Sequence, residues 1–384
     1  MVLPHLYKKY GLQLGVPGST LDAAIRYIKD IEGKNAVPIL SLKHLATSSD
    51  VSYAYLRSVV RRDLDDYIEI PRAKRDGSHR VISAPSEKLK GVQRQILRAI
   101  EGVPVHKASF AYRKGLSILD CAREHLGSNW LIKMDLHDYF GQITERRVYT
   151  SFRSIGYPPL ASLEMARICT RLVPHQEGEQ TCSGSSNWRL ARGASPGIPD
   201  YDQSRMGVLP QGGPTSGAIA NLVSSKLDQA LERFSIREGL QYTRYSDDLT
   251  FSGVGKFDRR RCAELIQESA RIISLHAFEV HEKKTKVVSP GGRKIVLGLL
   301  VEGEAVRLLP EFRERVQNHV RGVAKFGLVA HVDHRRFRSA ISFVNYVDGC
   351  LAFASGVDSE WAQRVRANWD NALLNDGFLP LELR

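Results

Sequence analysis

The sequence predicts an α+β fold, in which a sheet layer carries helices packed on one face. Short β-prone runs alternate along the chain with longer stretches whose apolar residues recur at helical spacing. The chain has 384 residues, which exceeds the usual size of a single hydrophobic core. We therefore expect two or three coupled subdomains around a sizeable core.

The N-terminal third combines helices with one hairpin. Helical periodicity runs through 20–66, and two short β-type runs at 67–71 and 80–83 flank an Asp-Gly turn signal and several basic residues. This pattern predicts a β-hairpin with a basic tip. A second amphipathic helix is expected over 87–101.

The rest of the chain continues the alternation of strands and helices. A segment rich in Gly, Ser, Pro and Gln shows no periodicity and predicts a long loop or insertion at 175–207. The other expected elements are a buried strand at 130–136, a helical stretch at 145–172, a helix at 214–238, a hairpin at 241–253, a helix at 258–275, strands at 278–288 and 294–301, and a mainly helical C-terminal region.

The charge balance favours a polyanionic partner. The 55 Lys and Arg residues exceed the 42 Asp and Glu residues, giving a net charge of +13 and a pI near 9.5. Nucleic-acid-binding proteins show this balance, although unrelated basic proteins do too. The five cysteines lack the paired spacing of zinc sites, and we interpret them as reduced thiols. Without a signal peptide or a long apolar run, the sequence predicts a cytoplasmic protein with no membrane span.

Three carboxylates are the best candidates for chemistry. Asp247 and Asp248 are adjacent at the tip of the predicted 241–253 hairpin, where their charges repel unless a cation lies between them. An Asp-Asp pair alone is more often only a turn. Asp135, however, ends another β-prone run, and strand ends of one sheet can converge. Three such carboxylates can hold two Mg²⁺ ions, and oxygen ligands without histidine or thiolate select magnesium.

A third element, at 209–216, ends the long loop and opens the predicted 214–238 helix. Its glycines permit close backbone approach, and the start of a helix presents free N–H groups, so the segment suits contact with a nucleotide. A Gly-Pro turn that merely begins a helix is the alternative interpretation.

Taken in order, these elements resemble the reverse transcriptase family, and within it the bacterial retron-type branch. The resemblance covers about 45–345 and rests on an ordered series of blocks. The Tyr-x-Asp-Asp signature stands at 245–248. The remaining blocks are 82–85 with nearby residues of the following helix, 135–140, 209–216, 281–286, and the primer grip at 296–298.

The resemblance implies a right-hand polymerase with palm, fingers and a helical thumb. The implied domains are an N-terminal helical lead-in at 1–66, fingers at 67–129, the first part of the palm at 130–174, a family insertion with the nucleotide-contact block at 175–240, the palm with its catalytic hairpin and primer grip at 241–303, and a helical thumb or RNA-binding region at 304–384.

The resemblance also assigns catalytic roles to individual residues. Asp135, Asp247 and Asp248 would be the metal ligands, with an indirect role left open for Asp248. Lys284, or its neighbour Lys283, would protonate the pyrophosphate leaving group, with an exposed lysine of no function as the alternative.

Nucleotide contacts are implied at several positions. Phe140 would be the steric gate that excludes a 2′-hydroxyl, unless it is a plain core aromatic. Gln211, with Gly212, would contact the incoming nucleotide. The other implied nucleotide-binding residues are Tyr245, Arg80 and Lys74, of which Lys74 is nearly as well explained as part of a solvated turn.

Nucleic-acid contacts are expected at the primer grip and in the C-terminal region. Gly298 belongs to the grip block, while Arg313, Arg321 and Lys325 recur at multiples of four on a predicted helix that begins at Pro310. Such a stripe suits a duplex backbone, although a charged stripe is often only a solvated face.

Two segments depart from the retron pattern. Cys121 stands where retron enzymes have Asn in an Asn-Ala-x-x-His segment that ends here at His125, and Leu297 stands where they have Thr. Neither change touches a predicted metal ligand. His125 is interpreted either as a contact to the branching RNA or as a packed helix-face histidine.

The implied function is that of a retron reverse transcriptase. It would copy part of a structured non-coding RNA into a branched RNA–DNA hybrid, using deoxynucleoside triphosphates and two Mg²⁺ ions, in antiphage defence with a separate effector protein and no membrane. The alternatives are another bacterial defence, intron or diversity-generating reverse transcriptase, or a catalytically silent RNA-binding module.

Overall fold

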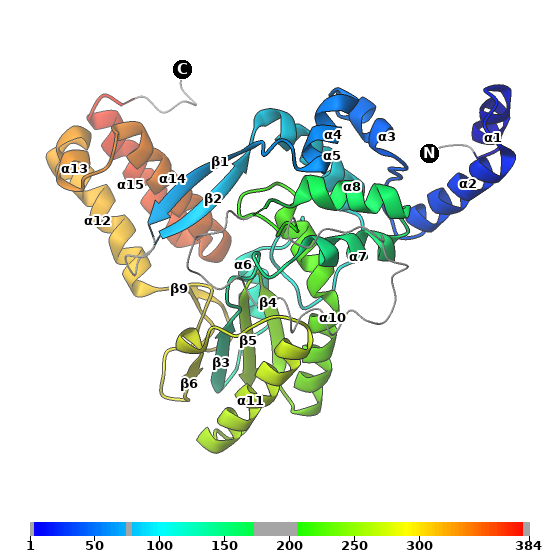
Figure 1. Ribbon diagram of the computed structural model, residues 1–384. Helices are drawn as coiled ribbons and strands as arrows, with labels where there is room; N and C mark the ends of the chain where they lie inside the picture. Colours follow the sequence, from blue (N-terminus) through cyan, green and yellow to red (C-terminus); the bar gives the residue numbers. More distant parts are fainter. Residues whose placement is uncertain (1–3, 74–78, 173–205, 379–384) are drawn as a thin grey trace, which may run out of the picture.

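The computed structural model describes residues 4–73, 79–172 and 206–378, and it has the predicted α+β composition (Figure 1). Lys74 and most of the predicted 175–207 loop lie outside the described residues. Three separate sheets are present in the described part, with helices around and between them.

The N-terminal region is helical, as predicted, and consists of separate helices. Pro17 and Ser52 begin the second and fourth of them, and side-chain caps at Ser41 and Ser52 accept backbone N–H groups as helix-starting serines commonly do. The helices are α1 (Pro4–Gln13), α2 (Gly18–Glu32), α3 (Leu42–Ser48) and α4 (Tyr53–Arg61). In Figure 1, α1 and the start of α2 project away from the rest of the molecule.

The predicted β-hairpin is present, although its basic tip lies outside the described residues. Strands β1 (Tyr67–Ala73) and β2 (His79–Pro85) pair antiparallel, and α5 (Glu87–Ile100) follows, capped by Ser86. At the base of the hairpin Arg171 donates to Asp65 and Glu69. This ion-pair cluster joins the hairpin to the segment that follows helix α8 (Pro159–Cys169).

A four-stranded antiparallel sheet, in the order β4-β5-β3-β6, is the centre of the molecule. Its strands are β3 (Trp130–Asp135), β4 (Gln241–Tyr245), β5 (Asp248–Gly253) and β6 (Lys286–Val288). Helices α10 (Ser216–Arg237) and α11 (Arg259–Leu275) lie along the sheet in Figure 1, and their apolar residues share its main core cluster. The short helix α6 (Ile118–Arg123) contacts β4.

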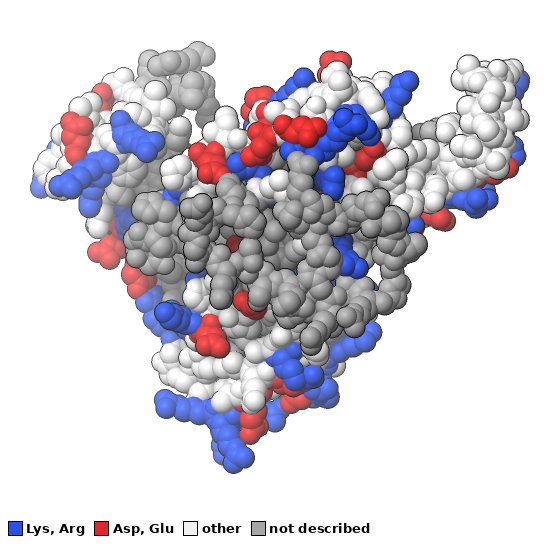
Figure 2. All heavy atoms as spheres, viewed as in Figure 1, with Lys and Arg blue, Asp and Glu red and all other residues white. Residues whose placement is uncertain are grey.

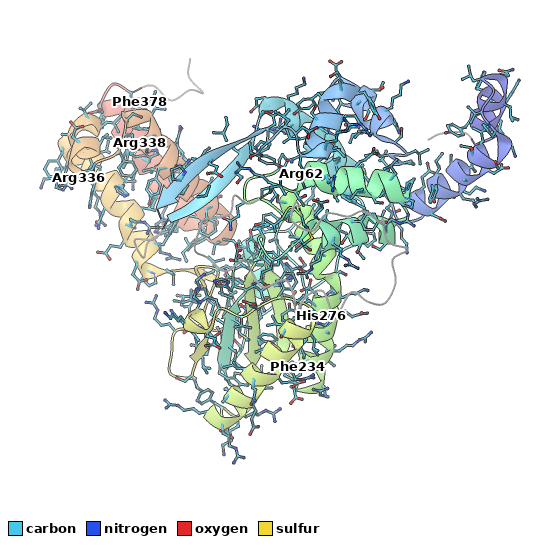
Figure 3. The ribbon with its side chains drawn as sticks, viewed as in Figure 1. Arg62, Phe234, His276, Arg336, Arg338 and Phe378 are labelled. Atoms are coloured by element: carbon cyan, nitrogen blue, oxygen red, sulfur yellow. The ribbon has the colours of Figure 1, made fainter. Side chains whose placement is uncertain are left out.

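Helices α7 (Glu145–Ile155) and α8 (Pro159–Cys169) replace the single helical stretch expected at 145–172. Gly156 adopts φ +114°, which ends α7, and the following prolines start a new helix. Arg62, labelled in Figure 3 beside α8, donates to the carbonyl of Thr170 and to Glu145. These buried contacts join α4, α7 and α8.

The C-terminal region has its own small sheet and core. Strands β7 (Ile295–Val296), β8 (Leu299–Leu300) and β9 (Arg307–Leu308) precede helices α12 (Pro310–Phe326), α13 (Leu328–His334), α14 (Ala340–Val357) and α15 (Ser359–Asn375). Figure 1 shows these helices as a bundle. By length and composition alone α14 could cross a membrane, yet its apolar face packs within this bundle.

Two predicted strands are shorter than expected. The 278–288 segment forms a 3₁₀ turn, η2 (Glu282–Lys284), before β6, and the 294–301 segment splits into β7 and β8. Leu297 and Gly298 both have positive φ, which turns the chain back on itself. The β-propensity of the sequence located both segments correctly. The turns within them, which shorten the strands, were not predicted.

Candidate active site

The three predicted carboxylates meet where β3 ends and β5 begins, at one end of the two middle strands of the central sheet. Asp135 is the last residue of β3 and pairs directly with Asp248, the first residue of β5. The amide of Leu136 donates to the carbonyl of Asp247 at 3.0 Å. Strand register therefore brings together residues that are far apart in the sequence.

The turn that carries Asp247 is tightly constrained. Ser246 has φ +60°, which is uncommon for a residue other than glycine, and its carbonyl accepts from the Arg244 guanidinium at 3.0 Å. Ser246 is 7% exposed, and the turn therefore holds its two carboxylates on a fixed backbone.

Burial and mutual repulsion oppose ionisation of the turn carboxylates. Burial raises the pKa of Asp247, and the negative charge of Asp135 adds to the shift. For Asp248, burial and then the charge of Asp247 raise the pKa to about 6. A nearby cation would relieve this repulsion.

Lys284 supplies positive charge beside the three carboxylates. Its ammonium donates to both carboxylate oxygens of Asp135, at 2.9 and 3.0 Å. Burial alone would lower the pKa of Lys284, but the hydrogen bond and the carboxylate charges raise it above its ordinary value. Lys284 lies on η2, beside the predicted metal ligands.

The same oxygens suit a hard divalent cation. Within the described ranges, no group of three or more ligand side chains is close enough to hold a metal ion as arranged. The donor chemistry nevertheless fits, because the carboxylates are all-oxygen ligands and the Lys284 ammonium already acts as a cation for Asp135. Metal binding at Asp135 would compete with this ion pair.

An entirely buried network supports the turn, and the sequence did not reveal it. Arg244 forms a bidentate ion pair with Asp228 of α10, at 2.7 Å for both contacts. Arg244 also donates to the Tyr139 hydroxyl and the Ser109 hydroxyl. A charged residue within a β-prone run was the available signal, but the partner of Arg244 depended on the tertiary fold.

The predicted nucleotide-contact block lies against the β1–β2 hairpin. The Ser83 amide donates to the Gln211 carbonyl at 2.7 Å. Gly212 has φ +122°, and a Cβ there would lie 2.7 Å from the Ser83 carbonyl oxygen, so only glycine fits. Arg80 lies on β2, although its side chain is outside the described residues.

Phe140 lies five positions after Asp135, partly buried against the main core. Its ring contacts the Tyr139 ring at a centroid distance of 5.4 Å and the Tyr112 ring, edge-on, at 6.3 Å. Tyr245 is partly exposed and pairs with Asp248 across the turn. Tyr112 was not a predicted site residue, because it belongs to none of the recognised blocks.

The C-terminal candidates do not share one environment. Arg313 donates to Asp358 at 2.5 Å and lies over the Trp361 ring, so it joins α12 to α15. Arg321 and Lys325 are exposed. In Figure 2 basic side chains gather over the outer part of the bundle, where Figure 3 labels Arg336 and Arg338.

His125 proves to be a packed histidine. Its ring is fully buried and hydrogen-bonds to the hydroxyls of Ser252, at 2.8 Å, and Thr243, at 2.7 Å. Burial lowers its pKa to about 3, which keeps the ring neutral. Of the two interpretations of His125, the structure therefore favours the packed histidine. The ring, just after α6, supports β4 and β5.

Comparison with known proteins gives one consistent family. The family described as "Reverse transcriptase (RNA-dependent DNA polymerase)" matches residues 72–318. The retron Mx162 reverse transcriptase of Myxococcus xanthus is 33% identical over 68% of this chain and 53% of its own length. The retron Ec86 reverse transcriptase of Escherichia coli is 29% identical over 74% of each chain. This chain thus aligns with about half of the first relative and three quarters of the second.

The raised carboxylate pKa values make a prediction about stability. Because the folded protein holds the Asp248 proton up to a pH of about 6, whereas the free side chain loses it near 3.8, ionisation destabilises the fold at neutral pH. Asp248→Asn should therefore stabilise the metal-free protein above pH 6, by at most about 2 kcal/mol after solvent screening. The gain should shrink as the pH falls from 6 towards 4.

Thermal unfolding with a chelator, over a series of pH values, measures this effect. Asp333→Asn is a matched control, because Asp333 is exposed on α13. A gain that does not change with pH would show that charge repulsion is not its origin.

Proposed function

Since the chain belongs to the reverse transcriptase family, we propose that it is the RNA-directed DNA polymerase of a retron. The observation that carries the activity is the convergence of Asp135, Asp247 and Asp248 at the ends of β3 and β5. The retron assignment is supported by relatives that are retron reverse transcriptases. A catalytically silent RNA-binding module is a poorer explanation, because such a protein would have no use for a cluster of carboxylates that repel one another.

The proposed architecture is a right hand. The central sheet with α10 and α11 would be the palm, within 130–174 and 241–303, and the β1–β2 hairpin would belong to fingers at 67–129. The 304–384 region, with its separate core, would be the thumb. In Figure 1 the hairpin and the C-terminal bundle both lie above the central sheet. The 1–66 and 175–240 segments would be the helical lead-in and the insertion with the nucleotide-contact block.

Reverse transcriptases generally use divalent metal ions, and we propose two Mg²⁺ ions here. Asp135 and Asp247 would hold them, with Asp248 as a direct or indirect ligand. When bound, the ions would supply activation of the attacking hydroxyl and charge stabilisation at the phosphate. The protein supplies the fixed Ser246 turn and the strand register that place these carboxylates.

The remaining side chains would bind and orient the substrates. Lys284 already lies within the carboxylate cluster, and its raised pKa keeps a proton available for the departing pyrophosphate. Phe140 would select the sugar, while Gln211 and Gly212 would line the nucleotide site against β2. The other proposed contacts are Tyr245, Arg80 and Lys74 with the nucleotide, and Gly298 with the primer.

The biological role is proposed from the same resemblance. The enzyme would copy part of its own structured RNA into a branched RNA–DNA hybrid, in the cytoplasm, and would act in antiphage defence with a separate effector protein. Sequencing the nucleic acid that co-purifies with the protein tests this role. A covalent RNA–DNA hybrid supports it, whereas a different template and priming site would favour another bacterial, intron or diversity-generating enzyme.

Loss of one carboxylate charge should abolish synthesis. Asp247→Asn keeps the side-chain volume but removes the charge of a proposed metal ligand, so extension of a primer on RNA with Mg²⁺ should fall by several orders of magnitude. Folding and RNA binding should be largely retained. The same change at exposed Asp333 should leave synthesis intact. Undiminished synthesis by Asp247→Asn would refute the assignment.

Removal of the Phe140 ring should relax sugar selection. Phe140→Ala is expected to raise incorporation of ribonucleotides relative to deoxynucleotides by roughly tenfold or more, with modest slowing of deoxynucleotide use. Phe312→Ala is a suitable control, because Phe312 is also partly buried but packs in the C-terminal core. Equal incorporation ratios in the Phe140 variant and wild type would mean that Phe140 is only a core residue.

The exposed basic residues of α12 should bind phosphate without reading sequence. Arg321 and Lys325 lie one turn apart, about 6 Å along the helix. Their joint replacement by Ala should weaken binding to unrelated duplexes equally and flatten the slope of log affinity against log salt by about two units. Arg260 and Arg261, exposed on α11, provide a control pair with the same loss of charge. An unchanged slope would identify the α12 residues as a solvated face.

A further inference from the structure

Tyr112 lies in the connection between α5 and α6, outside the sequence blocks named above. Its backbone has φ +58°, a conformation that bulky residues rarely adopt, and its side chain is 54% exposed. Strain of this kind persists only where surrounding contacts impose it, and it is concentrated at functional sites. The contacts of Tyr112 are therefore informative.

The connection that carries Tyr112 is firmly attached to its surroundings. The Phe110 amide donates to the Arg244 carbonyl at 2.9 Å, and the Arg244 amide donates to the Ala108 carbonyl at 2.7 Å. The Asn221 side chain of α10 donates to the Ala111 carbonyl at 2.7 Å. Tyr112 is thus held on a rigid support although its ring is exposed.

The Tyr112 ring packs closely against its neighbours. A Cβ added at Gly217, on the first turn of α10, would lie 2.3 Å from Cγ of Tyr112, so the ring rests where this glycine leaves space. The hydroxyl is 3.0 Å from the Ser246 hydroxyl in the carboxylate turn. The ring edge meets the Phe140 ring at a centroid distance of 6.3 Å.

Tyr112 consequently touches three segments that the proposed function places around the substrates. These are the Phe140 gate, the start of α10 directly after the nucleotide-contact block, and the turn at Ser246. An exposed aromatic face in the wall of a nucleic-acid site offers a surface on which any base can stack. The fixed orientation of the ring removes the entropic penalty of ordering it on binding.

We propose that Tyr112 is a stacking platform for a nucleobase of the base pair being formed. Its hydroxyl, through Ser246, would hold the ring in register with the carboxylate turn. The proposal rests on the proposed polymerase function, and it adds a substrate contact at a residue outside the sequence blocks named above.

Two substitutions separate the ring from its hydroxyl. Tyr112→Ala should lower kcat/KM for the incoming deoxynucleotide on an RNA template by roughly tenfold to a hundredfold, the effect of losing one base–aromatic stack. Tyr112→Phe keeps the stack and loses one hydrogen bond, so its loss should be less than about tenfold. Tyr10→Ala, at a tyrosine of similar exposure on α1, should have no effect.

A binding measurement gives a second readout that does not need catalysis. A template with 2-aminopurine at the coding position should be quenched on binding to wild type and to Tyr112→Phe, because a stacked ring quenches this base. The complex with Tyr112→Ala should be brighter. Equal emission from all three complexes would overturn the proposal, even if wild type made no DNA and the polymerase assignment itself had failed.

A substitution at Gly217 tests the packing of the Tyr112 ring. Gly217→Ala should displace the ring and reduce kcat/KM in the wild-type background, but it should add little in the Tyr112→Ala background, since coupled residues are not additive. Thermal unfolding of each variant would reveal any loss of folding. Additive losses, or equal losses for Tyr112→Phe and Tyr112→Ala, would show that the ring is not a stacking surface.

Discussion

The geometry of the site depends on the buried ion pair between Arg244 and Asp228. Both side chains are fully buried, and each of the five guanidinium N–H groups has an acceptor in Asp228, Tyr139, Ser109 or the Ser246 carbonyl. One side chain therefore connects the carboxylate turn, α10 and the residue before Phe140. Loss of either partner would leave an uncompensated buried charge, at about 3–5 kcal/mol, which explains how a strained turn remains fixed.

The carboxylates themselves are held in an unfavourable state. Burial and proximity raise the pKa values of Asp247 and Asp248, and the positive charge of Lys284, which is paired with Asp135, only partly offsets these shifts. The rigid turn prevents the carboxylates from moving apart, so repulsion persists until a cation or a proton arrives. The Arg244–Asp228 pair, by fixing the turn, therefore maintains the repulsion between the carboxylates.

Local patterns predicted the strands and helices that carry the site, because β-prone runs and helical periodicity are encoded within short windows. Asp135 at the end of β3 and Asp248 at the start of β5 followed from such runs. Contacts between distant segments were not predictable in this way. Tyr112 was missed because its environment is assembled from Gly217 and Ser246, and Arg313 was assigned to a solvent-facing stripe because Asp358 is far along the chain.

Strand β3 connects the site to the C-terminal region. Ile132 and Met134 pack into the main core, whereas Leu131 packs into the C-terminal core with residues of the small sheet. Apart from Lys133, the residues of this strand before its end are apolar, because they pack into the two cores. Asp135 stands at the end of the strand, so the strand that carries this predicted metal ligand also belongs to the core of the C-terminal bundle. A change in the packing of that bundle around Leu131 would therefore be transmitted along four residues to the predicted metal ligand.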